Sequence, residues 1–532
     1  MLPKVAALDL TKPLASFDKP HRKQRGFMTG ISIQNAIAVR NAFESIPTDG
    51  LKRRTIRGGA VTVVAQAACF ILQMGSTMVL ARLLTPWDYG LMAMVMVLTN
   101  ALNVFRDGGL STGTVQKASI THEQVSTLFW INIGLGCLLC LVTVAAAPVM
   151  VRVFQEPKLL PITLVLATTF PFNALTVQHE ALLNRQMRFT ALAVIEIIAM
   201  AVGIGVGIIM GNNGFGYWAL VGMTIAMTLT KVIAFGLAIR WVPGLPQLRC
   251  GVGSMLRFGG YLTGSKLLVY LFRNADNALI GWWWGAGPLG LYSKAYSILM
   301  LPINQVNAPM SGVAVPALSR VQNDPERVRR VFLGGYAILA SIILPIVLYL
   351  TIFTDEVVLV ILGQQWRPSI SLFRLLAPAA LVGALALNPL SWLFISTGRP
   401  ERQFRFGILW SGVLVAAFAF GVRFGPAGVA AAYSIISACL ALPLCLYAFR
   451  GTSIRLENLA NTLKAPAIAA LVAALAGTSM ALTIPNGVPA LVRALIGGGV
   501  VLAIYSVVLL LVMRQWSFYR DLLTQLFGPK SA

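Results

Sequence analysis

The amino-acid sequence predicts an all-α polytopic membrane protein of about 14 transmembrane helices, in which two parallel six-helix repeats form two lobes and two more helices follow. Three observations support this fold class. The chain is 57% hydrophobic and only 11% charged, whereas a soluble domain carries roughly 25% charged residues. Apolar stretches of about 20 residues, the length that crosses a bilayer, recur from residue 58 onward. Finally, a short motif that begins at Arg185 returns at Arg402.

The apolar stretches, separated by glycine, proline and charged residues, give the positions of the spans. The first six spans lie near residues 58–80, 87–110, 127–150, 158–180, 190–210 and 215–239. The next six lie near residues 258–281, 287–316, 331–353, 369–396, 406–422 and 426–449. The last two lie near residues 465–484 and 488–513.

These spans divide the chain into four parts. We expect an N-lobe over residues 55–249, a C-lobe over 250–450, and two final helices with a short cytoplasmic C-terminus over 451–532. Residues 1–54 are polar and basic and lack the apolar core of a signal peptide. They are expected to form a flexible cytoplasmic tail.

The distribution of lysine and arginine supports both the number of spans and their orientation. If the N-terminus is cytoplasmic, 31 of the 42 basic residues fall in segments on the cytoplasmic side and only five fall in outside joins. Basic residues concentrate on the cytoplasmic side of membrane proteins, so we expect both termini there. This bias, together with contact with anionic membrane lipids, explains the net charge of +24 better than nucleic-acid binding does.

The repeated motif indicates the symmetry of the two lobes. Residues 185–189 (RQMRF) and 402–406 (RQFRF) each precede the fifth span of a six-span unit, and Gly90-Leu and Gly290-Leu form a weaker echo. Because each unit has an even number of spans, both units enter the membrane from the same side and are parallel repeats. Such repeats are typical of secondary transporters that work by alternating access.

No enzyme active site, metal site or cofactor site is indicated by the sequence. The three histidines, His21, His122 and His179, form no nucleophile or metal constellation. No Gly-Lys-Ser/Thr loop that would hold a nucleotide phosphate is present. Cys137 and Cys140 have the spacing of a redox motif but lie within a predicted span, where packing is the expected role.

Several motifs resemble those of a known family. They stand in the order 82–91 (RLLTPWDYGL), 105–110 (FRDGGL), 274–276 (NAD), 289–296 (LGLYSKAY) and 316–320 (PALSR). In this order they resemble Wzx-type lipopolysaccharide and exopolysaccharide flippases of the multidrug/oligosaccharidyl-lipid/polysaccharide (MOP) superfamily, and within it the polysaccharide transporters of the succinoglycan and colanic acid type. The resemblance covers roughly residues 55–450. This chain departs from the family's pattern at Lys294, where arginine is expected, and at residues 282–284 (WWW), where a Gly-Arg pair is more usual.

The resemblance implies a fold and a substrate. The fold is the V-shaped arrangement of two lobes found in MATE and MurJ transporters. The substrate is an oligosaccharide repeat unit on an undecaprenyl diphosphate carrier, moved across the bacterial inner membrane for exopolysaccharide or lipopolysaccharide biosynthesis. Polysaccharide polymerase and co-polymerase proteins are the partners that it implies.

Charged residues inside spans are costly and are therefore candidates for function. In the predicted seventh span, Lys266, Tyr270, Arg273 and Asn277 recur at helical spacing and share one face. We expect Arg273 and Lys266 to contact the diphosphate or sugar phosphates of the substrate, because arginine and lysine are the side chains that bind phosphate, with Tyr270 and Asn277 beside them. Lys294 in the eighth span is a further candidate, although its side chain can also extend to the membrane interface.

Two carboxylates within spans are candidates for coupling transport to an ion gradient, namely Asp276 and Glu196. Each also has a structural interpretation. Asp276 can pair with Arg273 one helical turn away, and Glu196 can be a residue of the membrane interface near Arg188.

Two other functions remain open at this point. The chain can be an ion-coupled exporter of small molecules from the multidrug branch of the same superfamily, although that branch usually has 12 spans. It can also be a membrane polysaccharide polymerase or acyltransferase, although it has no long outside join and no histidine paired with a carboxylate within a span.

Overall fold

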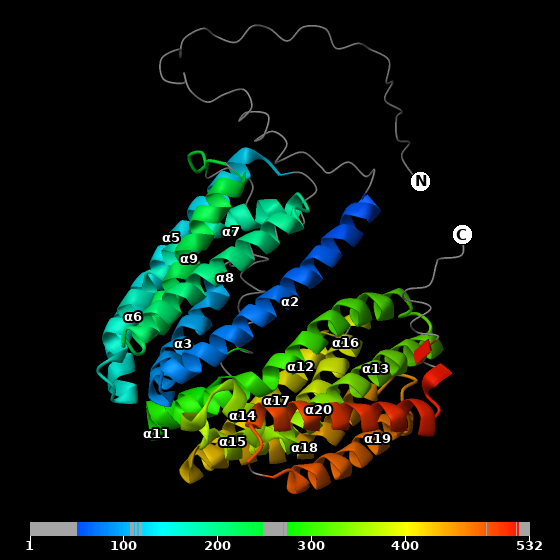
Figure 1. The fold of residues 1–532 in the computed structure, drawn as a ribbon. Helices are drawn as coiled ribbons and strands as arrows, with labels where there is room; N and C mark the ends of the chain where they lie inside the picture. Colours follow the sequence, from blue (N-terminus) through cyan, green and yellow to red (C-terminus); the bar gives the residue numbers. More distant parts are fainter. Residues whose placement is uncertain are drawn as a thin grey trace, which may run out of the picture. The chain divides into compact units, whose positions relative to one another are not determined.

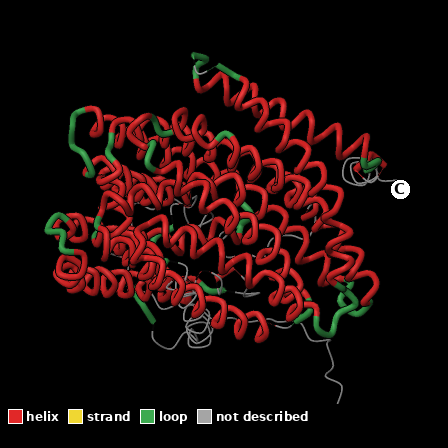
Figure 2. The backbone as a smooth tube through the Cα atoms, turned by 90° about the horizontal axis from the view of Figure 1, so that it is seen from below, coloured by secondary structure: helices red, strands yellow, loops and turns green. Residues whose placement is uncertain are grey.

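The computed structural model describes residues 51–106, 111, 114–115, 120–239, 241–247, 270, 274–398, 400–485, 487–517 and 519–520. Within these ranges the chain forms helices joined by turns and contains no strand, as Figure 2 shows. The all-α fold class predicted from the sequence is therefore confirmed. Of the predicted site residues, Lys266 and Arg273 lie outside the described residues, as does most of the predicted seventh span.

The N-lobe contains the six predicted spans. They are α2 (Leu51–Leu83), α3 (Pro86–Arg106), α5 (His122–Phe154), α6 (Leu159–Ala167) with α7 (Thr169–Arg185), α8 (Phe189–Asn212) and α9 (Trp218–Ile239). The fourth span is thus formed by two consecutive helices. Helix α2 begins at Leu51, inside the segment expected to be a tail, so the first helix is longer than its apolar stretch.

The C-lobe and the final helices also consist of helices that follow one another along the chain. The C-lobe contains α11 (Ala275–Trp284), α12 (Ala286–Arg320), α13 (Pro325–Ile352), α14 (Thr354–Ile361), η1 (Gln364–Trp366), α15 (Ser369–Val382), η2 (Gly383–Leu387), α16 (Asn388–Ser396), α17 (Pro400–Gly421), η3 (Val422–Phe424) and α18 (Gly425–Phe449). The last two spans are α19 (Leu456–Thr483) and α20 (Ala490–Val507), which ends in the π-helical turn η4 (Val508–Val512).

Twelve stretches of the described residues are long and apolar enough to cross a membrane. One of them, Glu401–Phe449, comprises α17 and α18, so thirteen of the predicted spans have a helical counterpart. Helix α14 was not predicted, because its eight residues are too few to cross a bilayer. It lies in an outside join, between the ninth and tenth spans.

Contacts between joins agree with the predicted alternation of sides. The Arg82 guanidinium, in the first outside join, donates a hydrogen bond of 3.0 Å to the carbonyl oxygen of Val360 in the outside join that holds α14. The Trp284 indole, in another outside join, donates a hydrogen bond of 2.6 Å to the carbonyl oxygen of Val422 in a third. Segments that the sequence assigns to the outside therefore touch one another.

The inside joins show the same agreement, and they do so in both repeats. Arg188 of the first RQxRF motif donates a hydrogen bond of 3.2 Å to the carbonyl oxygen of Ala238, near the end of the sixth span. Arg402 of the second motif donates one of 3.0 Å to the carbonyl oxygen of Arg450, after the twelfth span. In each copy, an arginine of the motif thus ties the start of the fifth span of its repeat to the end of the sixth.

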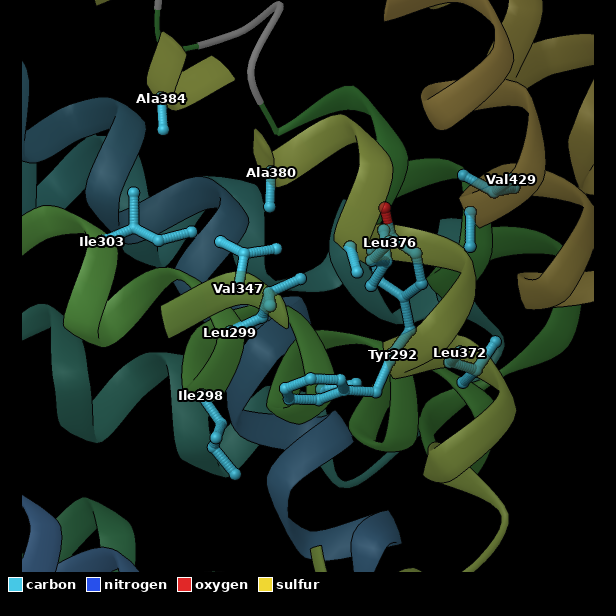
Figure 3. Close-up of a cluster of buried hydrophobic side chains, with 14 of the residues drawn as sticks. Tyr292, Ile298, Leu299, Ile303, Val347, Leu372, Leu376, Ala380, Ala384 and Val429 are labelled. Atoms are coloured by element: carbon cyan, nitrogen blue, oxygen red, sulfur yellow. The ribbon is translucent and has the colours of Figure 1, made fainter. Parts of the chain in front are cut away.

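Figure 1 shows helices α2 to α9 together as one group and the helices from α11 onward as a second group. The second group has a continuous apolar core between α12, α13, α15 and α18. Figure 3 shows part of it, where Leu376 and Ala380 of α15 lie near Leu299 of α12 and Val347 of α13. This core fixes α12, which carries the side chains that face the N-lobe.

Candidate functional site: the contact between the two repeats

The closest approach between the two repeats is a contact of helix backbones. A Cβ atom added to Gly90 of α3 would lie 1.7 Å from the carbonyl oxygen of Ala286, and one added to Gly290 of α12 would lie 1.7 Å from the carbonyl oxygen of Pro86. Small residues let membrane helices approach this closely. Gly90 and Gly290 are the residues that the sequence pairs as equivalent positions of the repeats. Two positions that the sequence pairs as equivalent therefore meet in this contact, which we call the α3–α12 seam.

The beginning of α3 is fixed by a capping box. The Thr85 hydroxyl accepts a hydrogen bond of 3.3 Å from the backbone N–H of Asp88, and the Asp88 carboxylate accepts one of 2.9 Å from the backbone N–H of Thr85. Pro86 occupies the first helical position, where its missing N–H costs nothing. These residues explain much of the TPWDYG part of the motif at 82–91, because they set where α3 starts and so where Gly90 meets α12.

Tyr89 lies between two side chains of the C-lobe. The Lys294 ammonium lies 4.2 Å from the centroid of the Tyr89 ring. The same ring meets the Trp366 indole edge to face at 5.4 Å. A cation above an aromatic face is stabilised by about 0.5–2 kcal/mol, depending on how dry the site is. Among the described residues, Lys294 has no carboxylate partner.

The segment that follows α14 holds the end of α2. The Gln365 side chain donates a hydrogen bond of 2.9 Å to the carbonyl oxygen of Leu84. The Trp366 indole donates one of 2.8 Å to the carbonyl oxygen of Ala81. Trp366 is fully buried. Since no helical N–H follows the last turn of α2, its carbonyl oxygens need these donors.

Of the predicted seventh span, the structure describes Tyr270 and the residues from Asn274 onward. The Tyr270 hydroxyl donates a hydrogen bond of 3.2 Å to the carbonyl oxygen of Met96, about midway along α3. Asn277 is half-buried, and its side-chain oxygen has no hydrogen-bond partner within the described part of the chain. Of the two predicted residues, Tyr270 therefore contacts the N-lobe, and Asn277 carries a polar group without a partner among the described residues.

Asp276 is buried and held by its neighbours. Its carboxylate accepts a hydrogen bond of 2.8 Å from the hydroxyl of Tyr292 and one of 2.7 Å from the backbone N–H of Asn277. Tyr292 is itself fully buried in the C-lobe core. This arrangement fastens α11 to α12. The sequence also suggested that Asp276 pairs with Arg273, but Arg273 lies outside the described residues.

Glu196 lies away from the α3–α12 seam, within the N-lobe. Its carboxylate forms a salt bridge of 2.7 Å with the Lys231 ammonium, which links α8 to α9. The two side chains keep 44% and 26% of their exposure. The sequence suggested Arg188 as the neighbour of Glu196, and the pairing with Lys231 was not predicted because Lys231 lies 35 positions further along the chain.

The structure thus places Lys294 against Tyr89 and Tyr270 against Met96, both on α3 of the other repeat, while Asp276 and Asn277 lie on α11, which also contacts α3. It also adds Tyr89, Gln365 and Trp366, which were not predicted as site residues. The hydrogen bonds and ring contacts described between the repeats extend from the outer ends of the helices to about the middle of α3. The described contacts between the repeats therefore lie toward the helix ends that the sequence assigns to the outside.

Comparison with known proteins gives a consistent result. Residues 79–371, more than half of the chain, match the family described as "Polysaccharide biosynthesis protein". The lipopolysaccharide biosynthesis protein WzxC of Escherichia coli is 25% identical over 393 residues, which cover 73% of this chain and 79% of that protein. The succinoglycan biosynthesis transport protein ExoT of Rhizobium meliloti is 23% identical over 331 residues, covering 62% of this chain and 67% of that protein.

Solved structures with the same fold are transporters. The lipid II flippase MurJ, in an inward closed conformation, matches with a TM-score of 0.68 at 15% identity, covering 86% of this chain and 98% of that one. A multidrug resistance MATE transporter of the MOP superfamily, in an inward-facing conformation, matches with a TM-score of 0.57 at 17% identity, covering 73% and 96%. The predicted fold, that of a multi-pass membrane protein of the MurJ and MATE type, is confirmed.

Proposed function

Because the chain belongs to the family of polysaccharide biosynthesis proteins, we propose that it is a flippase for undecaprenyl-diphosphate-linked oligosaccharide repeat units in the bacterial inner membrane. It works by alternating access and supplies exopolysaccharide or lipopolysaccharide biosynthesis. Both termini face the cytoplasm, a placement supported by the excess of basic residues on that side. Polysaccharide polymerase and co-polymerase proteins are its proposed downstream partners, and the chain itself is not an enzyme.

The observation that carries this proposal is the α3–α12 seam between two equivalent glycines, Gly90 and Gly290. A contact between equivalent helices of the two repeats, at the end that the sequence assigns to the outside, is what alternating access requires of a closed outer gate. Opening that gate separates the backbones and removes Lys294 from the Tyr89 ring. A substrate diphosphate that draws the ammonium away from the ring would favour opening.

We propose that the substrate's diphosphate binds Lys294 together with Lys266 and Arg273, and that Tyr270 and Asn277 contact the first sugars. The hydrogen bond of Tyr270 to Met96 of α3 supports this, because Lys266 and Arg273 recur at helical spacing with Tyr270 in the sequence. For Asp276 and Glu196, the partners Tyr292 and Lys231 favour structural roles over ion coupling.

The test is deletion of the gene followed by analysis of lipid-linked intermediates. We expect surface polysaccharide to be lost and repeat units to accumulate on the cytoplasmic leaflet, where an impermeant glycosidase or oxidant cannot reach them. Complementation with the wild type restores export, whereas the double variant Lys266→Ala, Arg273→Ala does so poorly at equal expression. Normal polysaccharide with reduced dye efflux would instead identify a small-molecule exporter.

A further inference from the structure

A polar cavity of about 430 Å³ lies in the C-terminal half of the protein, separate from the α3–α12 seam. It is formed where α13, α19 and the segment after η4 meet. The residues around its mouth are Glu326, Arg329, Arg330, Asn461, Thr462, Gln515 and Tyr519. Its apolar part is formed by Leu333, Ala337, Ala465 and Pro466, with Gly334 beside them. Neither the motifs of the family nor the proposed transport path accounts for this cavity.

The charge of the cavity is positive. Arg329 forms a salt bridge of 2.6 Å with Glu326 one turn earlier on α13. Arg330 has neither a carboxylate nor a hydrogen-bond partner among the described residues. Asn461 and Thr462 add neutral polar groups from α19. The site therefore presents one uncompensated cation beside several donors, which is the chemistry that binds a phosphate group.

The cavity spans the depth of a lipid headgroup. All three contributing segments belong to the side that carries the excess of basic residues, and Ser453, in the join before α19, donates a hydrogen bond of 2.5 Å to the carbonyl oxygen of Pro325 at the start of α13. From Arg329 to Ala337 the helix rises by about 12 Å. That distance exceeds the headgroup layer, which is about 5–7 Å on each side. The arginines thus sit at the polar surface, while the deeper residues enter the hydrocarbon.

An apolar surface continues from the cavity along α19. Ile468, Val472 and Leu475 follow Ala465 at intervals of three and four residues, so they share its helical face. These three side chains keep 36%, 39% and 62% of their exposure. A phospholipid whose phosphate binds Arg330 and whose acyl chains lie against this face of α19 contacts both the polar and the apolar parts of the surface. A free phosphate ion would use only the first.

We propose that this cavity is a binding site for an anionic phospholipid, with the headgroup phosphate on Arg330 and Arg329 and the acyl chains along α19. Basic pockets between spans on the cytoplasmic side bind acidic lipid headgroups in other membrane proteins. The C-terminal segment completes the site, because Tyr519 hydrogen-bonds to Ser341 of α13 and holds that segment over the cavity mouth.

The experiment measures lipid binding to the purified full-length chain by native mass spectrometry, in delipidated detergent micelles supplied with phosphatidylglycerol. Arg330→Ala is expected to weaken phosphatidylglycerol binding roughly tenfold, the loss of about one charge-assisted hydrogen bond. The matched control is Arg327→Ala, on the same turn of α13. Its side chain is 71% exposed, pairs with Asp324 and does not line the cavity, so binding should match the wild type.

Further arms separate the possible ligands. Phosphatidylcholine at the same concentration should bind no more tightly to the wild type than to Arg330→Ala. Inorganic phosphate or pyrophosphate that displaces phosphatidylglycerol at equal concentration would overturn the lipid assignment in favour of a free anion. Equal phosphatidylglycerol binding by wild type, Arg330→Ala and Arg327→Ala would overturn the site itself. None of these results depends on transport, so failure here leaves the proposed flippase function unaffected.

Discussion

Gly90 and Gly290, which the sequence pairs as equivalent positions of the two repeats, each pack against the backbone of the other's helix. A side chain on Gly90 would collide with the carbonyl oxygen of Ala286, four positions before Gly290. A side chain on Gly290 would collide with the carbonyl oxygen of Pro86, four positions before Gly90. Because backbone cannot move away as a flexible side chain can, any substitution at either position separates the helices. The equivalence of the two positions makes the effect of changing either one comparable.

Gly90→Ala should therefore open the α3–α12 seam. Forcing a methyl group into a packed contact costs typically about 1–3 kcal/mol, and here it acts on the outer gate. We expect polysaccharide export to fall sharply and a cysteine placed near the seam to react faster with an impermeant maleimide. Gly287→Ala is the control, since nothing lies within 4 Å of an added Cβ there. Equally slow labelling of both variants would show that the close approach of Gly90 to α12 does not hold the seam closed.

Lys294→Met should reduce export, because it keeps the apolar stem and removes the charge above Tyr89. A loss of roughly tenfold in transport rate corresponds to one charge-assisted contact with phosphate. Lys158→Met is the matched control, since that ammonium lies 4.3 Å from the Trp87 ring and both residues belong to the N-lobe. Transport is measured with lipid-linked substrate in proteoliposomes; equal rates for both variants would remove Lys294 from the site.

Tyr292→Phe should lower the thermal stability of the protein in detergent. The change removes the hydrogen bond from Tyr292 to the buried carboxylate of Asp276, while the bond from the Asn277 N–H remains, and a hydrogen bond to a charged group contributes about 1.5–3 kcal/mol. Tyr447→Phe is the comparison, because no hydrogen bond of that hydroxyl is found among the described residues. If the two variants unfold at the same temperature, the Tyr292–Asp276 contact does not fasten α11 to α12.

Glu356→Gln should loosen the final helices from the C-lobe. Glu356 of α14 forms a salt bridge of 2.9 Å with Arg493 of α20, and its side chain is only 7% exposed. Breaking a buried pair costs about 3–5 kcal/mol. The neighbouring Asp355 pairs with Arg374 where both side chains are about half exposed, so Asp355→Asn should cost at most about 1 kcal/mol. Limited proteolysis of the join between α18 and α19 reports the difference.

The fold could be predicted from the sequence because it depends on local signals. Apolar stretches set the spans, and the excess of basic residues in alternate joins set their sides. The ends of the helices were predicted less accurately than their number. Helix α2, for example, begins at Leu51, because a helix can extend beyond the apolar stretch that crosses the bilayer. Helix α14 was missed because eight residues in an outside join carry no membrane signal.

The site could be predicted only in part. Lys294 and Tyr270 were found because polar residues within spans stand out against an apolar background. Tyr89 and Trp366, which meet in the site, are 277 positions apart in the sequence, and no periodicity connects them. The motif around Tyr89 was visible as a family resemblance, but its physical reason, the capping of α3 and the approach of Gly90 to α12, required the structure.

The two helices of the seam differ in stiffness. Helix α12 contains Pro302, Pro309 and Pro316, whereas α3 has no proline beyond its first position. Each internal proline removes one backbone hydrogen bond and weakens the helix against bending. The prolines recur every seven residues, so they fall on one side of the rod and favour flexing in one plane. When the lobes move relative to each other, α3 should therefore move as a rigid body, whereas α12 should bend. The two repeats would then contribute differently to the motion.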